Sequence, residues 1–255
     1  MVMTMKTGFE TRRGDIGVLL LHGLSGTSAE VEPLGQYLAE RGYSTLGPLM
    51  KGHGTSPQDL AQTTWQDWAE GALEAYEVLQ RTCSKVFVGG LSMGADQALH
   101  LAAHHPVAGV ISMAAPVRIP DIRFMGIAFF RFLQWRTSTL NGGLLDLEAP
   151  KPSVYPFVAT KSLYELKKLM DRVRSELPRV TAPTLVIHGR KDSKVPAANA
   201  ETIVRALGSV RKHLVYLDRS DHVVTMDFDK DIVFETVLRF IETDGVRCDA
   251  ASEIV

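Results

Sequence analysis

The sequence is poor in cysteine and nearly balanced in charge. Its 255 residues include only two cysteines, Cys83 and Cys248, which lie far apart in the chain. Two such thiols make neither a disulfide framework nor a cluster of metal ligands. The formal net charge is −1, with no basic face and no acidic tail. The composition therefore argues against a nucleic-acid partner and against a disordered chain.

The sequence also lacks long apolar runs. No stretch approaches the roughly 18 apolar residues that a membrane-spanning helix needs. Residues 1–15 have no continuous apolar core of the kind found in signal peptides. We therefore expect a soluble, cytoplasmic protein without a membrane span, and the sequence makes no prediction of its oligomeric state.

Strand patterns and helix patterns alternate through most of the chain. The run 16–21 is almost wholly apolar, as in a parallel strand that is buried on both faces. The expected strands are 9–13, 16–21, 43–47, 86–90, 107–113, 183–188 and 213–217, and the expected helices are 32–41, 64–81, 95–105, 198–207 and 231–241. This alternation predicts an α/β fold with a doubly wound, mostly parallel sheet, in which ligands bind at the carboxyl ends of the strands.

The alternation breaks after residue 116 and resumes at residue 183. The segment between them is far longer than the usual connection of a few residues. Two stretches within it, 125–135 and 161–177, favour helices. We therefore divide the chain into a core, formed by residues 1–116 and 183–255, and a helical cap insertion, residues 117–182.

A Gly-x-Ser-x-Gly pentapeptide, Gly90 to Gly94, lies between a predicted strand and a predicted helix. In this context the pentapeptide is typical of a nucleophile elbow, a sharp turn that exposes the serine hydroxyl. Ser92 is therefore the candidate nucleophile. The alternative is a serine in an ordinary glycine-rich turn, and the flanking strand and helix make that alternative weaker.

A serine nucleophile needs an adjacent base, and the base needs an acid that orients it. His222 is the best candidate for the base, because it is the last histidine of the chain and follows the last predicted strand. For the acid there are two candidates, Asp192 just past a strand end and Asp221 beside His222. We favour Asp192, since neighbouring residues rarely orient each other's side chains well. The other histidines are weaker candidates: His22, His53, His100, His104, His105, His188 and His213.

The oxyanion that forms during attack by a serine needs backbone N–H donors. One candidate is the N–H of Met93, the residue after the nucleophile. The second donor is expected in the loop 22–26, which follows the strand 16–21, and Leu24 is the candidate there. The alternative for this loop is a tight turn that only leads into a helix.

Six stretches of the sequence together resemble the α/β-hydrolases of the bacterial monoacylglycerol lipase and carboxylesterase group. They are 22–26, 51–55, 63–68, 90–94, 192–196 and 220–223, and they are spread over most of the chain outside the insertion. The resemblance implies a serine hydrolase of acyl esters with Ser92 as nucleophile, His222 as base and Asp192 as its acid. It also implies Leu24 and Met93 as oxyanion donors, and a cap over the acyl pocket.

Two departures from that group bear on the substrate. Leu24 stands where such proteins often have Phe, and Tyr155 is followed by Pro156 where a monoacylglycerol lipase is expected to have glutamate. We therefore expect an esterase or lipase that cleaves medium- to long-chain acyl esters, with monoglycerides as one candidate substrate. Phe129 and Phe130 in the insertion are candidates for the lining of an acyl channel, unless they only pack the cap onto the sheet.

Other classes of function stay open from the sequence. An acyltransferase or a peptidase can use the same three residues, and a ligand-binding protein can keep the fold without catalysis. No cluster of His, Cys or Asp has metal-ligand spacing and no phosphate-binding glycine loop is evident, so we expect neither a metal nor another cofactor. The expected partner is a small-molecule acyl ester or monoglyceride.

Overall fold

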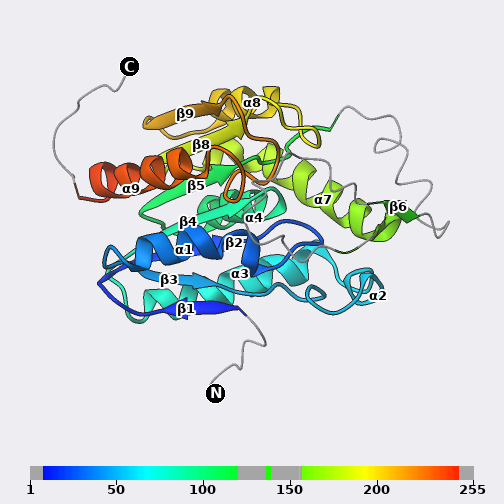
Figure 1. Ribbon diagram of the computed structural model, residues 1–255, viewed down its shortest axis with the longest axis horizontal. Coiled ribbons are helices and arrows are strands. Elements are labelled where there is room, and N and C mark those ends of the chain that lie inside the picture. The colour runs from blue at the N-terminus through cyan, green and yellow to red at the C-terminus, as the bar shows by residue number, and fades with distance from the viewer. Residues whose placement is uncertain (1–7, 120–135, 139–154, 156, 247–255) are drawn as a thin grey trace.

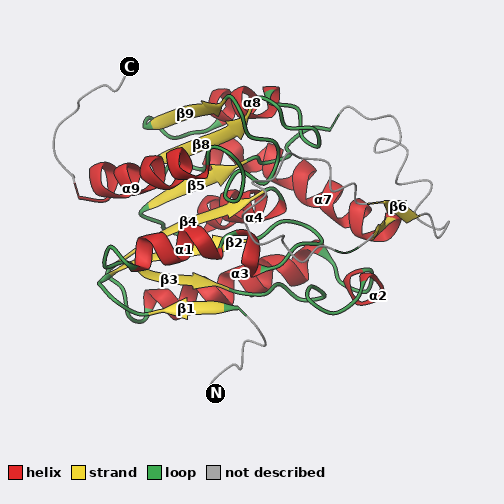
Figure 2. Cartoon of the chain, in the orientation of Figure 1, coloured by secondary structure: helices red, strands yellow, loops and turns green. Residues whose placement is uncertain are grey.

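The computed structural model has a central seven-stranded sheet with helices on both faces (Figure 1, Figure 2). It describes residues 8–119, 136–138, 155 and 157–246. The strand order is β1-β3-β2-β4-β5-β8-β9, in which β1 runs antiparallel to β3 and all other neighbours are parallel. The predicted α/β fold with a doubly wound, mostly parallel sheet is confirmed.

The elements of the sheet and its flanking helices have the following bounds. The strands are β1 (Phe9–Thr11), β2 (Ile16–Leu21), β3 (Ser44–Gly47), β4 (Lys85–Leu91), β5 (Gly109–Met113), β8 (Thr184–Gly189) and β9 (Lys212–Leu217). The helices are α1 (Glu32–Ala39), α2 (Pro57–Leu60), α3 (Trp65–Gln80), α4 (Met93–His104), α7 (Thr160–Glu176), α8 (Ala198–Ala206) and α9 (Lys230–Val246), with short 3-10 turns η1 (Ser28–Glu30) and η2 (Leu177–Arg179).

The core lies on both faces of the sheet, because alternate residues of a strand point to opposite sides. In β2, Val18 and Leu20 pack with α1 and α9, which cross in front of the sheet in Figure 1. Leu19 and Leu21 pack on the other face with α3, α4, α7 and α8. All four side chains are fully buried, which explains why this strand has an almost uninterrupted apolar sequence.

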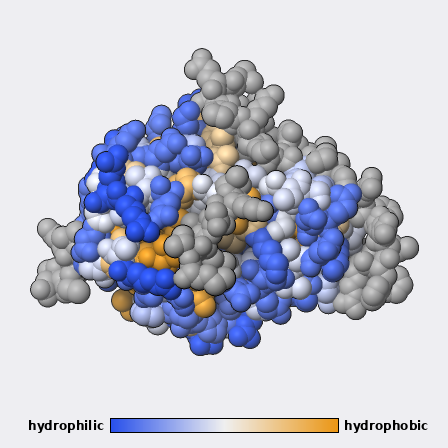
Figure 3. All heavy atoms as spheres, turned by 90° about the horizontal axis from the view of Figure 1, so that it is seen from below, coloured by the Kyte–Doolittle hydropathy of each residue, from blue (hydrophilic) through white to orange (hydrophobic). Residues whose placement is uncertain are grey.

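The face of the described part that is seen from below is mainly hydrophilic (Figure 3). In the view from below, hydrophobic residues occupy limited areas between hydrophilic ones (Figure 3). No helix among the described residues has the length and apolar character that a bilayer crossing requires.

Most predicted elements are present, with ends shifted by a few residues. Helix α3 begins at a capping box, in which Asp67 and Thr64 each accept a hydrogen bond from the other's backbone N–H. The helix expected over 161–177 is α7. Two features were not predicted, α2 and a two-stranded antiparallel pair within the insertion, β6 (Arg136–Ser138) and β7 (Phe157–Ala159). The helix expected over 125–135 lies outside the described residues, and the division into core and cap stays a prediction.

Candidate active site

Ser92 lies in the sharp turn between β4 and α4. Its backbone dihedrals are φ 55° and ψ −120°, a strained combination for a residue with a side chain. The turn is held because the Ser92 N–H donates a 2.8 Å hydrogen bond to the carbonyl of Met113 at the end of β5. This geometry is that of a nucleophile elbow.

The two glycines of the pentapeptide allow the strand and the helix to approach each other. A Cβ atom on Gly94 would lie 2.1 Å from the Leu21 carbonyl oxygen, and one on Gly90 would lie 2.3 Å from the backbone of Gly94. Neither position accepts a side chain without moving the backbone of α4 or of β2. The sequence pattern around Ser92 is therefore a packing requirement of the elbow.

Asp192 and His222 meet at the same edge of the sheet. Asp192 follows β8 and His222 follows β9, and these strands are parallel neighbours. The Nδ1 atom of His222 donates to Oδ2 of Asp192 at 2.8 Å. The other carboxylate oxygen of Asp192 accepts the backbone N–H groups of Lys194, at 2.9 Å, and of Val195, at 2.8 Å. The strand β5 separates β8 from β4, so Ser92 ends its strand at this edge too.

The Asp192 carboxyl is ionised despite being fully enclosed. Its side chain has no exposed surface, and burial by itself raises the pKa of a carboxyl. Hydrogen bonds from His188, His222 and Val195 and the charge of His222 outweigh that effect, and the pKa of Asp192 lies well below its usual range. The carboxylate therefore accepts the Nδ1–H of His222, so Nε2 is the ring nitrogen that can take a proton from a substrate or from Ser92.

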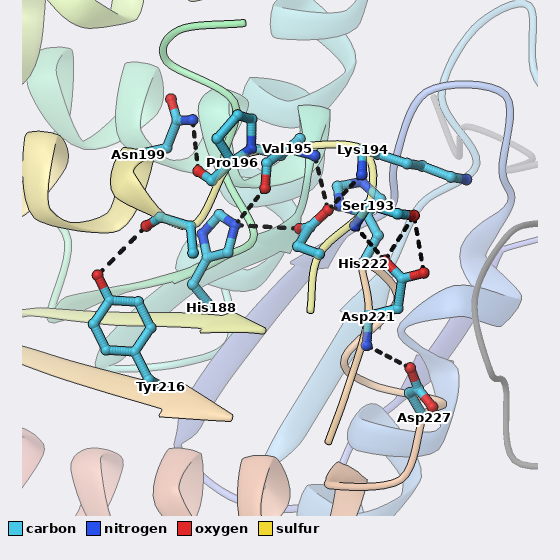
Figure 4. A network of polar contacts seen from close by, with 12 residues as sticks. His188, Ser193, Lys194, Val195, Pro196, Asn199, Tyr216, Asp221, His222 and Asp227 are labelled. Atoms are coloured by element: carbon cyan, nitrogen blue, oxygen red, sulfur yellow. Dashed lines mark hydrogen bonds and ion pairs between the residues drawn. The ribbon is translucent and has the colours of Figure 1, made fainter. Parts of the chain in front are cut away.

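Asp221, the other candidate acid, does not contact the ring of His222 through its carboxylate. Both of its oxygens accept the Ser193 hydroxyl, at 3.0 and 2.9 Å, and one accepts the Ser193 N–H at 2.7 Å (Figure 4). The N–H of Asp221 donates to Asp227. Asp221 thus joins the loop after β9 to the loop after β8.

His188 supports the acid, a contact that was not predicted from the sequence. His188 is the next-to-last residue of β8 and is fully buried. Its Nε2 atom lies 3.1 Å from the Val195 carbonyl oxygen and 3.2 Å from Oδ2 of Asp192 (Figure 4). Two acceptors at one nitrogen require that Nε2 carries the proton. The only sequence signal was a histidine at a strand end, four residues before the acid.

The loop after β2 lies against Ser92, the candidate nucleophile. A Cβ atom on Gly23 would be 3.5 Å from the Cβ of Ser92. The loop is tightly wound, with Ser25 at φ 65°. Both predicted oxyanion donors lie near this contact between the loop and Ser92. Leu24 is within the loop, and Met93 is in the first turn of α4, where amides have no acceptor inside the helix.

His22 and His53 are structural residues beside this loop. Burial lowers the pKa of His22 to about 4 and that of His53 to about 3. His22 donates from Nδ1 to the Gly23 carbonyl at 2.9 Å and accepts the Met50 N–H at Nε2 at 3.1 Å. Both rings are therefore neutral at neutral pH, and His22 fixes the base of the loop.

One interpretation from the sequence needs correction, since a group with metal-ligand spacing is present. His100 and His104 lie on one face of α4, and with Glu176 at the end of α7 their ligand atoms lie within 4.8 Å of one another. The histidines contact Glu176 at 2.6 and 2.7 Å, and Arg172 contacts the same carboxylate at 2.5 Å. The guanidinium disfavours a second cation, and the network ties α7 to α4.

The candidate acyl-channel residues, Phe129 and Phe130, lie outside the described residues. The described end of the insertion contacts the loops around the site. Tyr155 donates its N–H to the Ser25 carbonyl at 3.1 Å and its hydroxyl to the Gly52 carbonyl at 2.9 Å, and the same hydroxyl accepts the Thr55 N–H.

Lipases and esterases are among the known proteins to which this chain is similar. The chain is 36% identical over 233 residues to a thermostable monoacylglycerol lipase of Bacillus sp. (strain H-257), covering 91% of this chain and 92% of that protein. It is 30% identical to a carboxylesterase of Bacillus subtilis (strain 168), covering 92% and 95%. Among solved structures, one from a study of the metagenome-derived lipolytic enzymes LipS and LipT has a TM-score of 0.89 at 30% identity, covering 95% of this chain and 99% of that one.

The fold alone is shared more widely. A monoacylglycerol lipase of Paleococcus ferrophilus has a TM-score of 0.77 at 17% identity, covering 92% of this chain and 98% of the other. The sequence pattern of the family described as serine aminopeptidase, S33, matches residues 15–229, which include every residue that the structure brings to the candidate site. The chain belongs to this family of α/β-hydrolases.

Proposed function

We propose that this protein is a serine hydrolase of carboxylic esters and that Ser92, His222 and Asp192 form its catalytic triad. The observation that supports the proposal is the 2.8 Å bond between His222 and Asp192, at the sheet edge where the strained Ser92 turn ends β4. Two relatives that are at least 30% identical, a monoacylglycerol lipase and a carboxylesterase, support the ester substrate.

We derive the proposed reaction from the hydrogen bonds at the carboxyl edge of the sheet. His222 Nε2 takes the proton of the Ser92 hydroxyl as its oxygen attacks the acyl carbonyl, and Asp192 stabilises the imidazolium that forms. The N–H groups of Leu24 and Met93 donate to the oxyanion. His222 then gives the proton to the alcohol oxygen that leaves. Water, deprotonated by His222, releases the acid from the acyl-enzyme on Ser92 in the second half of the cycle.

The substrate class is a small-molecule acyl ester, which includes monoglycerides. The relative named as a monoacylglycerol lipase supports monoglycerides among the substrates. The absence of the expected glutamate after Tyr155 favours a broader ester range than monoglycerides alone.

The test is hydrolysis of p-nitrophenyl esters by the wild type and by Ser92→Ala. Loss of the nucleophile is expected to lower kcat by roughly 10⁶-fold while the melting temperature stays within a few degrees. A variant that keeps a tenth of the wild-type kcat would place the nucleophile elsewhere. Aminoacyl p-nitroanilides run in parallel test the peptidase activity that the family description names, and a higher kcat/KM on them than on any ester would overturn the proposal.

A further inference from the structure

Glu30 is a buried carboxyl that the mechanism above does not use. It ends η1, eight residues after His22, and only 4% of its surface is exposed. Its Oε2 atom accepts the Gly23 N–H at 2.8 Å. A Cβ atom on Gly26 would lie 2.2 Å from Oε1 of Glu30. The loop 23–26 therefore closes around this carboxyl, and Gly26 has no side chain where the carboxyl lies.

Glu30 also contacts the loop that carries the base. Its backbone carbonyl accepts the hydroxyl of Thr225, a fully buried residue three positions after His222. Burial raises the pKa of the Glu30 carboxyl, while the Gly23 N–H and the nearby charges of His222 and Lys194 act in the opposite direction. One residue thus links the candidate oxyanion loop to the His222 loop.

The hydrogen bonds of the loop amides show what this arrangement does. The Gly23 N–H is taken by Glu30, and the Gly26 N–H donates to the Gly23 carbonyl at 3.3 Å. The Leu24 N–H has no acceptor within the described part of the chain. If Glu30 released Gly23, that amide would compete for the same acceptors and the turn would lose the anchor that fixes its orientation.

We propose that Glu30 is a positioning residue that locks the loop 23–26, so that the Leu24 N–H, rather than the Gly23 N–H, meets the oxyanion. The inference rests on the proposed ester hydrolysis at Ser92. The group that matters is an oxygen acceptor at the position of Oε2. Glutamine supplies such an acceptor without charge, whereas leucine has a similar size and supplies none.

The experiment compares Glu30→Gln and Glu30→Leu with p-nitrophenyl butyrate. Loss of one oxyanion donor costs on the order of 10²-fold in kcat, and we expect a loss of this size for Glu30→Leu with KM changed less than threefold. Glu30→Gln is expected to keep kcat within fivefold of the wild type. Inhibition by butyl boronic acid, which forms a tetrahedral adduct on serine, is expected to weaken in Glu30→Leu by the same factor as kcat/KM.

Gly26→Ala displaces the Glu30 carboxyl while Glu30 itself is unchanged. The new methyl group displaces the flexible end of Glu30, so kcat and boronate affinity are expected to fall together in this variant too. Thr27→Ala is the matched control, because the Thr27 side chain makes no cap hydrogen bond to η1, and it is expected to behave as the wild type.

Three results would overturn the role of Glu30. They are wild-type kcat in Glu30→Leu, a Glu30→Gln variant as impaired as Glu30→Leu, and a lower kcat without weaker boronate binding. Thermal melting gives the folded fraction of each variant, and so separates a change in the site from a loss of activity that is caused by unfolding. Failure of the proposed function would be seen differently, as absence of ester hydrolysis in the wild type or its persistence in Ser92→Ala.

Discussion

The substitution Asp192→Asn is expected to lower kcat on the order of 10⁴-fold, because an amide at this position fixes the wrong tautomer of the base. That factor corresponds to about 5 kcal/mol of transition-state stabilisation. The side chain changes by one atom and its volume stays the same. The loss therefore reports hydrogen-bond direction rather than packing.

The direction of the hydrogen bond between residue 192 and His222 follows from the contacts of the two carboxylate oxygens of Asp192. One accepts the N–H groups of Lys194 and Val195, and the other accepts His222 Nδ1–H at 2.8 Å. In the variant, the amide oxygen stays with the two backbone donors, which cannot give up their protons, whereas the rings of His222 and His188 on the other side can each change tautomer. The NH₂ group then faces His222 and donates to Nδ1. The ring proton moves to Nε2, which removes the lone pair that accepts the serine proton.

The assay is kcat on p-nitrophenyl butyrate at a known concentration of folded protein, with thermal melting as the check on folding. Asp221→Asn is the matched control. Asp221 accepts from Ser193 rather than from the His222 ring, and an asparagine oxygen still accepts there, so kcat is expected to stay within about tenfold. Asp192→Asn with more than a tenth of the wild-type kcat, or Asp221→Asn as the more damaged variant, would refute the reasoning.

Three further outcomes are expected. Both carboxylate oxygens of Asp96 are buried without a hydrogen-bond partner among the described residues, and burial raises the pKa of this carboxyl well above its usual value. Its contribution to stability is present below about pH 4 and is lost as the pH rises toward the folded pKa. The free energy of unfolding of Asp96→Asn, measured by chemical denaturation, should therefore exceed that of the wild type by a margin that grows from pH 4 to pH 8 and reaches roughly 1–3 kcal/mol. Dialysis against EDTA should leave ester hydrolysis unchanged, because Arg172 already neutralises Glu176, and recovery of lost activity with Zn²⁺ would contradict this. The kcat/KM for p-nitrophenyl esters should rise from acetyl to octanoyl, since each buried methylene contributes about 0.8 kcal/mol, and a polar residue at Phe129 or Phe130 should flatten that rise; a profile that peaks at acetyl would rule out the acyl channel.

Local sequence determined the parts of the site that depend on short-range backbone geometry. The glycines around Ser92 are needed because a Cβ atom on Gly94 would collide with the Leu21 carbonyl of the neighbouring strand β2, so the elbow can be recognised as a five-residue pattern. The apolar character of β2 likewise follows from burial on both faces. Such features recur wherever the same strand, turn and helix succeed one another.

Only the tertiary structure decided which groups meet. The sequence placed Asp192 and Asp221 after two consecutive predicted strands, but the path of each loop determines that Asp192 faces the ring and Asp221 faces Ser193. His188 and Glu30 carried no motif, because their roles consist of single hydrogen bonds to backbone and side-chain atoms of other loops. A strand pattern specifies that a loop begins at the carboxyl edge of the sheet. The direction of each side chain within that loop depends on the packing and hydrogen bonds of the whole edge, which the order of residues alone does not contain.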